Sequence, residues 1–305
     1  MAVFAGFDLG GTQLKEGLLA SDGRVLHKAV SPSPPAMPAF LELLASRWRI
    51  LQGLSPEPIR AAGIGLPGIY DRERRRVLQS PNFPALDGFD LHPALGRVLS
   101  APFDVDNDAN LAAFGEWRLG AGRGADSLVL LTIGTGIGGA IIAGRSLWRG
   151  HRGYAGELGH LSVNPEGRLC PCGNRGCLET EVSAPAVVRH YRELGGAAEA
   201  LTAEAVHRRA ADGEDAARRA FARAGRALGL GLGLLINILN PERIVLGGGV
   251  MSAGPFLLDP AIEEARRRSF RDAFDSCAVV PAALGNDAGF IGAALWAAES
   301  AGRDA

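Results

Sequence analysis

Apolar and polar residues alternate in stretches that predict strands and helices in turn along the chain. Residues 2–10 are an apolar run that ends in Asp8 and Gly10, and further strands are expected over 14–20 and 24–30. An amphipathic helix is predicted over 37–51 and a buried strand over 59–68. The chain therefore begins with three consecutive strands before its first helix.

The same order of elements returns in the second half of the chain. Residues 102–108 predict a strand, 109–120 a helix, and 127–144 two strands joined by a Gly/Thr turn. The chain is then mostly helical over 183–238, followed by a strand at 243–248, a helix at 256–268, a strand at 277–282 and a last helix at 287–298. The recurring hairpin indicates a duplicated architecture, and the whole pattern favours an α/β fold with mixed sheets.

Length and spacing add three expectations about organisation. A chain of 305 residues exceeds one ordinary core, so we expect an N-terminal lobe over 1–115, with the C-terminal helix 287–303 packed back on it, and a C-terminal lobe over 116–286. Residues 71–76 (DRERRR) predict a solvated turn between strands. Gly225, Gly229 and Gly233 share one helix face and predict close helix packing.

Composition excludes several classes of partner. The formal charge of −1 gives no basic surface for nucleic acid, and the longest nearly apolar run, 227–239, is too short to span a bilayer. The first residues carry no secretory pattern, and three of the four cysteines fall in one short segment, which makes disulfides unexpected. These features predict a cytoplasmic protein.

The segment 157–179 (ELGHLSVNPEGRLCPCGNRGCLE) carries the most specific chemical signal. One histidine and three cysteines in a Gly/Pro-rich loop can surround a single tetrahedral Zn²⁺, and the four ligands are His160, Cys170, Cys172 and Cys177. Glu157 and Glu179 lie at the two ends and stay available for other chemistry. A set of unrelated buried thiols is the alternative, and the remaining Cys277 is expected to be a small core residue.

Two Gly/Thr turns are candidate phosphate sites. Residues 8–12 (DLGGT) end a strand with a carboxylate, which can hold Mg²⁺, and continue into a turn whose backbone N–H groups can reach phosphate oxygens. Residues 132–139 (TIGTGIGG) repeat this logic in the second half. Each alone is also compatible with an ordinary hairpin turn, and the pair is more specific than either.

Three other segments carry polar or bare backbone groups. Residues 106–110 (DNDAN) offer carboxylates and amides at a strand end, suited either to a general base with orienting amides or to an N-cap of the next helix. Asn82 lies in a Pro-bracketed loop that is otherwise a plain turn. Residues 247–249 (GGG) follow a strand and could lie against a nucleotide, or could simply connect strand to helix.

Seven motifs in one order resemble the ROK family (repressors, open reading frames and sugar kinases) over nearly the whole chain. They occupy 8–12, 65–68, 107–110, 135–139, 157–160, 170–179 and 247–249, and CPCGNRGCLE at 170–179 is the most specific. The resemblance implies a hexokinase/actin-like fold with two RNase H-like lobes around a central cleft and a zinc-binding loop. Such proteins are commonly dimeric, so a homodimer is expected.

The same resemblance implies ATP-dependent phosphorylation of the 6-hydroxyl of a hexose, with Asp108 as general base. Sugar contacts are implied for Gly65, Asn82, Asn107, Asp108, Glu157, His160 and Glu179. Asp8 would organise Mg²⁺, phosphates would lie on Gly10, Gly11, Thr12, Thr135 and Gly136, and Gly247 and Gly248 would line the adenosine. His160 would bind a structural zinc through one ring nitrogen and leave the other for a sugar hydroxyl. Many relatives carry Lys directly after GGT, whereas Gln13 follows here.

Several readings compete with a glucokinase. The segments 170–179 and 115–124 look more like glucokinases than fructokinases of this family, while kinases of N-acetylglucosamine or N-acetylmannosamine stay open. A DNA-binding repressor would carry a helix-turn-helix before the first hairpin, and Asp8 comes too early to leave room for one. A non-catalytic sugar-binding regulator is a remote alternative, and polyphosphate-using relatives look shorter and lack the cysteine loop.

Overall fold

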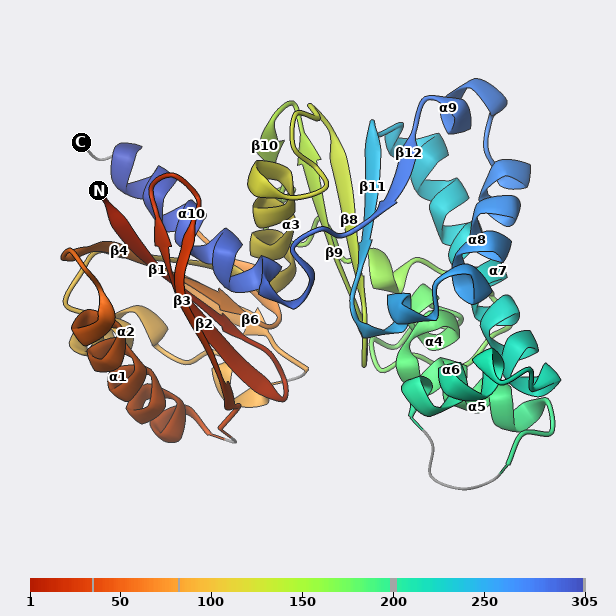
Figure 1. The fold of residues 1–305 in the computed structure, drawn as a ribbon, viewed down its shortest axis with the longest axis horizontal. Helices are drawn as coiled ribbons and strands as arrows, with labels where there is room; N and C mark the ends of the chain where they lie inside the picture. The colour runs from red at the N-terminus through yellow and green to blue at the C-terminus, as the bar shows by residue number, and fades with distance from the viewer. Residues whose placement is uncertain (35, 82, 198–201, 304–305) are drawn as a thin grey trace. The chain divides into compact units, whose positions relative to one another are not determined.

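The computed structural model describes residues 1–305 except 35, 82, 198–201 and 304–305 (Figure 1). The chain divides into two compact units. Unit 1 contains Met1–Gly124, Ser146–Ala155 and Ala283–Ala305, and unit 2 contains Ala125–Arg145 and Gly156–Ala282. The chain therefore passes between the units at several points, and each unit is built from segments distant in sequence.

The first sheet has five strands in the order β3-β2-β1-β4-β7. Its strands are β1 (Val3–Leu9), β2 (Gln13–Ala20), β3 (Val25–Pro32), β4 (Ile59–Leu66) and β7 (Phe103–Asn107). The first three pair antiparallel, while β4 pairs parallel with both β1 and β7. The carboxyl ends of β1, β4 and β7 consequently meet at one edge of the sheet.

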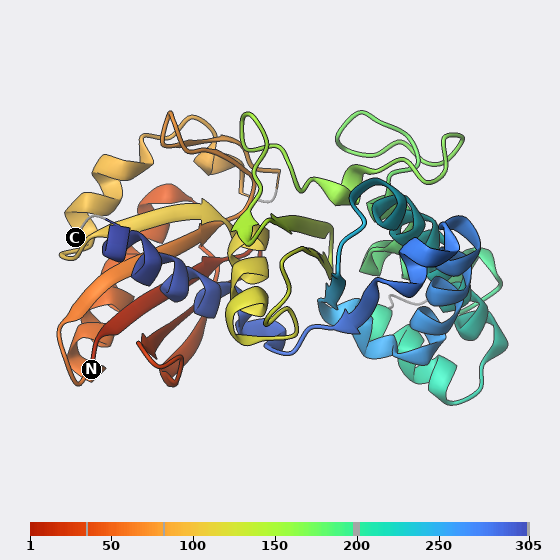
Figure 2. The same ribbon diagram turned by 90° about the horizontal axis from the view of Figure 1, so that it is seen from above.

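Helices cover both faces of this sheet because its central strands are buried on both sides. α1 (Met37–Leu54) and α2 (Leu91–Val98) bury Phe40, Trp48 and Leu95 in the core on one face. α3 (Asp108–Leu119) and α10 (Ala288–Arg303) pack against each other, and α10 also packs on β1 and β4 (Figure 2). A short hairpin of β5 (Ile69–Asp71) and β6 (Arg76–Gln79), with the turn η1 (Pro84–Leu86), completes the unit.

Glycine allows α10 to approach the sheet at backbone distance. A Cβ atom on Gly63 would collide with the carbonyl group of Ala293, and one on Gly6 would collide with that of Phe290. No side chain fits between the sheet and α10 at these points, so the glycines are structural.

One buried carboxylate ties two distant parts of unit 1 together. Glu116 in α3 accepts hydrogen bonds from the backbone N–H groups of Ala121 (2.8 Å), Ala283 (3.1 Å) and Leu284 (2.7 Å). Three N–H donors satisfy a buried carboxylate without a cationic partner. The chain just after α3 and the chain returning before α10 are thus fixed to one side chain.

The second sheet repeats the order of the first. It runs β10-β9-β8-β11-β12, with β8 (Leu128–Ile133), β9 (Ile137–Ala143), β10 (Ser146–Leu147), β11 (Arg243–Gly247) and β12 (Ala278–Pro281). β8 pairs antiparallel with β9, and β11 pairs parallel with both β8 and β12. The predicted duplication is therefore confirmed for the strand order and for the directions of β8, β9, β11 and β12.

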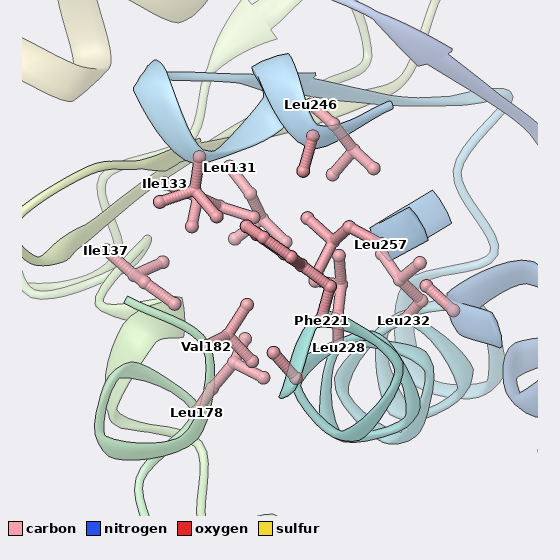
Figure 3. Close-up of a cluster of buried hydrophobic side chains, with 14 of the residues drawn as sticks. Leu131, Ile133, Ile137, Leu178, Val182, Phe221, Leu228, Leu232, Leu246 and Leu257 are labelled. Atoms are coloured by element: carbon pink, nitrogen blue, oxygen red, sulfur yellow. The ribbon is translucent and has the colours of Figure 1, made fainter. Parts of the chain in front are cut away.

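Helices of unit 2 pack around a core that Figure 3 shows. Phe221, Leu228 and Leu232 of α7 meet Leu131 and Ile133 of β8 there. The elements are η2 (Leu158–His160), α4 (Leu178–Val182), α5 (Ala184–Glu193), α6 (Ala203–Ala211), α7 (Asp215–Leu239), η3 (Gly249–Ala253), α8 (Pro255–Arg268) and α9 (Arg271–Asp275). η4 (Gly285–Asp287) leads into α10 of unit 1.

The longest helix, α7, is a core helix. Gly225 and Gly229 lie against the backbone carbonyls of Leu257 and Ala261 in α8, so the predicted close packing is confirmed. Among the described helices, α7 alone has the length and hydropathy of a membrane span, yet half of that apolar stretch is buried within the fold. Its burial against α8 accounts for its apolar composition.

The predicted solvated turn at 71–76 is only partly correct. The segment does connect β5 to β6, but Asp71 is buried. Arg72 donates hydrogen bonds to Asp104 (2.9 Å) and Asp106 (3.2 Å) on β7. These acidic partners lie 32 and 34 positions downstream in sequence, so the charge run alone does not predict the ion pairs.

Candidate functional site

Asp108 lies where β7 ends and α3 begins. It is the first residue of α3, and Asn107 is the N-cap, whose side-chain oxygen accepts a hydrogen bond from the Asn110 N–H (2.9 Å). The Asp108 carboxylate accepts from the Ala109 N–H (2.8 Å). A carboxylate at a helix N-terminus is stabilised by the helix dipole, which holds this side chain in one place.

Asn107 fits both interpretations of the 106–110 segment, the helix N-cap and the orienting amide. Its Nδ2 donates to the Gly68 carbonyl (2.9 Å) and to Asp108 Oδ1 (3.1 Å) while its oxygen caps the helix. The cap and the orienting amide are therefore the same residue, and Asp108 is held by it through one carboxylate oxygen.

Asp8 and Asp108 flank a glycine at the common strand edge of unit 1. A Cβ atom on Gly65 would come within 3.4 Å of the Asp108 Cα and 3.6 Å of Asp8 Oδ1. On its other side, the Asp8 carboxylate lies against Gly289 at the start of α10. Burial raises the pKa of Asp8 to about 6, with the charge of Lys15 opposing the shift. A nearby cation would stabilise the charged form of this buried carboxylate.

The turn after β1 presents exposed backbone. Gly10 N–H closes the hairpin on the Gln13 carbonyl (2.8 Å), and the Ser33 hydroxyl donates to the Gly10 carbonyl (2.5 Å). Gly11 and Thr12 are exposed at the tip. The hairpin is thus fixed at its base while its tip faces solvent.

The corresponding turn of unit 2 joins β8 to β9 and is bonded to Glu179. The Ile137 N–H donates to Glu179 Oε2 (2.8 Å), and a Cβ atom on Gly136 would lie 2.5 Å from that oxygen. Thr135 is exposed at the tip. Glu179, assigned from sequence to the sugar, is therefore also an anchor for the predicted phosphate turn.

Glu157, His160 and Glu179 form one group in unit 2. Glu157 Oε2 lies 3.8 Å from His160 Nε2. Burial raises the pKa of Glu157, the charge of Glu179 raises it further, and His160 opposes both. Glu157 and His160 are therefore adjacent, and the charge of Glu179 acts on Glu157.

The other ring nitrogen of His160 faces the cysteines. Its Nδ1 is 3.7 Å from Cys170 Sγ, Cys172 and Cys177 sulfurs are 3.6 Å apart, and all four ligand atoms lie within 4.8 Å of one another. Ligands at zinc-binding distances in a tetrahedron stand about 3.3–3.8 Å apart. Burial raises the pKa of Cys170 and Cys177, so thiolates at these two positions require a compensating cation. The donor set fits Zn²⁺.

The triple glycine after β11 has one structural member. Gly248 has φ +92° and no room for a Cβ atom, which would collide with the Ile133 backbone at the end of β8. A Cβ atom on Gly247 would lie 3.2 Å from the Ala282 side chain, whereas Gly249 faces open space. Gly248 therefore packs this turn directly against the strand that leads into the second hairpin.

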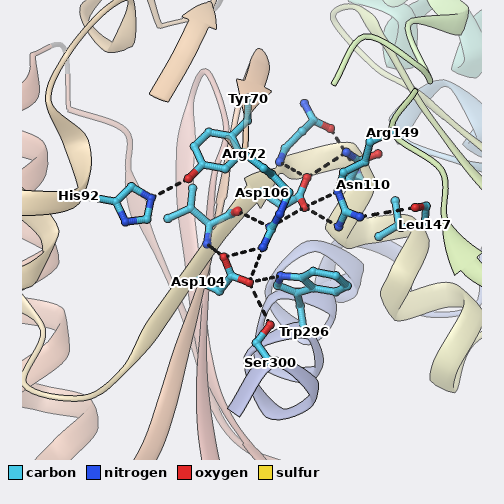
Figure 4. A network of polar contacts seen from close by, with 12 residues as sticks. Tyr70, Arg72, His92, Asp104, Asp106, Asn110, Leu147, Arg149, Trp296 and Ser300 are labelled. Atoms are coloured by element: carbon cyan, nitrogen blue, oxygen red, sulfur yellow. Dashed lines mark hydrogen bonds and ion pairs between the residues drawn. The ribbon is translucent and has the colours of Figure 1, made fainter. Parts of the chain in front are cut away.

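A network of charged groups that no short sequence motif reveals supports the end of β7 (Figure 4). Asp106 is almost fully buried, and its Oδ2 accepts from Arg149 (2.6 and 2.8 Å) and Arg72 (3.2 Å). Asp104 accepts from Arg72 and from the Trp296 indole N–H (2.8 Å). No sequence pattern points to Arg149, because its partner is 43 residues away. The acidic residues at the end of the strand indicate only that some cationic group pairs with them.

The predicted residues fall into two sets, each gathered within its own unit. Unit 1 holds Asp8, Gly10, Gly11, Thr12, Gly65, Asn107 and Asp108, and unit 2 holds Thr135, Gly136, Glu157, His160, Cys170, Cys172, Cys177, Glu179, Gly247 and Gly248. Asn82 lies outside the described residues.

Comparisons with known proteins agree over nearly the whole chain. A sequence profile described as "ROK family" matches residues 4–300. A glucokinase of Thermotoga maritima is 36% identical over 301 residues, covering 95% of each chain. A solved ROK family glucokinase from Streptomyces griseus, in complex with glucose and AMPPNP, is 32% identical with a TM-score of 0.85, covering 98% of this chain and 100% of that one.

Two further matches are a hexokinase and a repressor. The solved ROK hexokinase from Thermus thermophilus is 34% identical with a TM-score of 0.86, covering 99% of this chain and 100% of that one. A xylose repressor of Bacillus subtilis is 30% identical over 238 residues, covering 78% of this chain and 61% of that protein.

Proposed function

This chain belongs to the ROK family, and we propose from that premise that it is an ATP-dependent kinase acting on the 6-hydroxyl of glucose. The observation that carries the proposal is the pairing of two carboxylates, Asp8 and Asp108, around Gly65 at one strand edge. Asp8 is suited to bind a cation, and Asp108 is suited to accept a proton. Relatives named glucokinase match over almost their full length, which favours glucose among hexoses.

Asp108 is assigned the role of general base. It accepts the proton of the 6-hydroxyl as that oxygen attacks the γ-phosphorus of ATP, and ADP leaves with the bonding electrons. Asn107 donates to one oxygen of Asp108 and so orients the carboxylate. Asp8 is suited to hold Mg²⁺, which when bound neutralises charge on the phosphoryl oxygens.

The remaining contacts are assigned by chemistry. Glu157, His160 and Glu179 would accept and donate hydrogen bonds to other sugar hydroxyls, together with Gly65 and Asn107. The exposed turns Gly10–Thr12 and Thr135–Gly136 would bind phosphates through backbone N–H groups, and Gly247 and Gly248 would line the adenosine. A site that hydrogen-bonds each hydroxyl discriminates strongly against sugars lacking one.

Zinc is assigned a structural role. Four protein ligands would fill its coordination sphere, so no position stays open for substrate. His160 would bind it through Nδ1 because that nitrogen faces Cys170, leaving Nε2 on the side of Glu157. Zinc would thus fix the tautomer and orientation of a sugar-binding imidazole.

Cys172→Ser is expected to lower bound zinc to below one ion per chain and to raise the KM for glucose, because His160 loses its fixed orientation. Metal content by mass spectrometry and the glucose KM check both. Cys277→Ser is the matched control, because Cys277 is a core residue of unit 2 outside the cluster. A full zinc complement in the Cys172 variant would remove this cysteine from the ligand set.

A coupled ADP-release assay across glucose, mannose, fructose, N-acetylglucosamine and N-acetylmannosamine tests the function. We expect Mg²⁺-dependent turnover with glucose as the preferred sugar. Absence of turnover with every hexose would refute the kinase, and sugar binding without turnover would instead identify a non-catalytic regulator, as the repressor relative suggests. We further propose a cytoplasmic homodimer.

A further inference from the structure

Residues 146–155 are a segment of unit 1 that lies, in sequence, between two segments of unit 2. The segment ends directly before Glu157 and His160, two residues assigned to the sugar. Its attachment to the rest of unit 1 runs through contacts with β5, β7 and α10.

The first attachment is the pair Arg149–Asp106. Arg149 donates through Nε (2.8 Å) and Nη2 (2.6 Å) to the same oxygen of Asp106. The second oxygen of Asp106 accepts from the Asn107 N–H (2.8 Å) and from Asn110 Nδ2 (2.9 Å). Asp106 thus joins Arg149 to Asn107, which precedes Asp108 and donates to it, and to Asn110 in the first turn of α3.

The Arg149 guanidinium is also fixed from its flat side. Its Cζ lies 4.6 Å from the centre of the Trp296 ring, within the range of a cation–π contact. Trp296 is itself held by the hydrogen bond to Asp104. Arginine can make the paired hydrogen bonds and the stacking together, which a lysine cannot.

Two further contacts fold the segment back on itself and on β5. The Ala155 N–H donates to the Arg149 carbonyl (3.1 Å), so the ends of 149–155 are joined. Gly153, with φ +83°, lies so close to the Tyr70 carbonyl that a Cβ atom would come within 2.6 Å. The loop 149–155 is consequently closed on itself and packed against β5.

We propose that Arg149 is a positioning residue for the kinase reaction, acting through Asp106, Asn107 and Asn110 on Asp108. The proposal rests on the proposed function. Arg149 is assigned no contact with substrate; it aligns the base through Asp106, whose Oδ2 also accepts from Arg72. Neither phosphate turn is part of the network.

Arg149→Met is expected to lower kcat/KM for glucose by about 10- to 100-fold, the scale of a misplaced catalytic group, while the KM for ATP changes less than about twofold. Arg149→Lys keeps the charge beside Asp106 but loses the paired geometry and the stacking. We expect it to recover thermal stability relative to the Met variant without recovering kcat. Arg145→Met is the control, because Arg145 is exposed and pairs with Asp126 at the surface.

Steady-state kinetics with each substrate varied, and thermal unfolding of each variant, decide the matter. A Met variant with wild-type glucose kinetics, or a Lys variant with full turnover, would overturn the positioning role. Equal loss of glucose and ATP affinity would also overturn it, since that indicates general destabilisation. If the wild-type protein itself phosphorylates no hexose, the proposed function fails instead, so the two failures are distinguishable.

Discussion

Asp108→Asn is expected to reduce kcat by roughly two to four orders of magnitude while leaving glucose affinity largely unchanged. Asparagine has the same shape, so it can still accept from the Ala109 N–H and from Asn107 Nδ2 at the start of α3. The amide cannot take the proton of the 6-hydroxyl. The loss therefore falls on the transition state and spares the ground-state complex.

The measurement pairs steady-state kcat with a glucose dissociation constant from calorimetry. Asp215→Asn is the matched control, because Asp215 also begins a helix, α7, and is largely exposed. The control should retain wild-type turnover. An Asp108 variant that turns over normally would show that another group accepts the proton, and one that no longer binds glucose would assign Asp108 to binding.

Gly63→Ala is expected to destabilise the protein strongly, because the added methyl group would occupy the place of the Ala293 carbonyl in α10. The neighbouring atoms are backbone and cannot rotate away, so β4 and α10 must separate. Overpacking of this kind costs about 1–3 kcal/mol and often more where backbone has to move. We expect a lower urea midpoint of unfolding and reduced soluble yield.

Gly53→Ala is the control for that experiment. Gly53 lies in α1, and a Cβ atom added there would meet nothing within 4 Å, so alanine is expected to stabilise the helix by about 0.5–1 kcal/mol. The two substitutions add the same methyl group with opposite expected signs. Equal midpoints for both variants would mean that α10 does not approach β4 as closely as described.

Local features of this chain are predictable because short segments carry them. The hairpin at β1–β2 follows from an apolar run, a Gly turn and a second apolar run, and the His160–Cys177 cluster follows from spacing within one loop. The helix that begins at Asp108 is marked by its own N-cap, Asn107. In each case the interacting groups are near neighbours in sequence, so a short stretch of the sequence is enough to predict them.

Long-range polar pairs were not predictable. Glu116 bonds to Leu284, 168 residues away, and Arg149 to Asp106, 43 residues away; each looks like an ordinary surface charge until the fold brings the partners together. Arg72 lies in an exposed turn as predicted, but its ion pairs with β7 could not be predicted for the same reason. The bond from the Ile137 N–H to Glu179 was missed because it depends on how α4 packs beside β9.

The repeated strand order makes it possible to compare equivalent positions in the two sheets, and one such pair carries different side chains. In the first sheet Asp8 pairs with Lys15 across the hairpin and with Gly65 on the parallel side; in the second, Thr132 pairs with Gly138 and Gly247 in the same way. Asp8 and Thr132 are thus equivalent positions, one anionic and one neutral. The end of β1 therefore carries a carboxylate whose pKa is raised by burial, and the equivalent position at the end of β8 carries a hydroxyl.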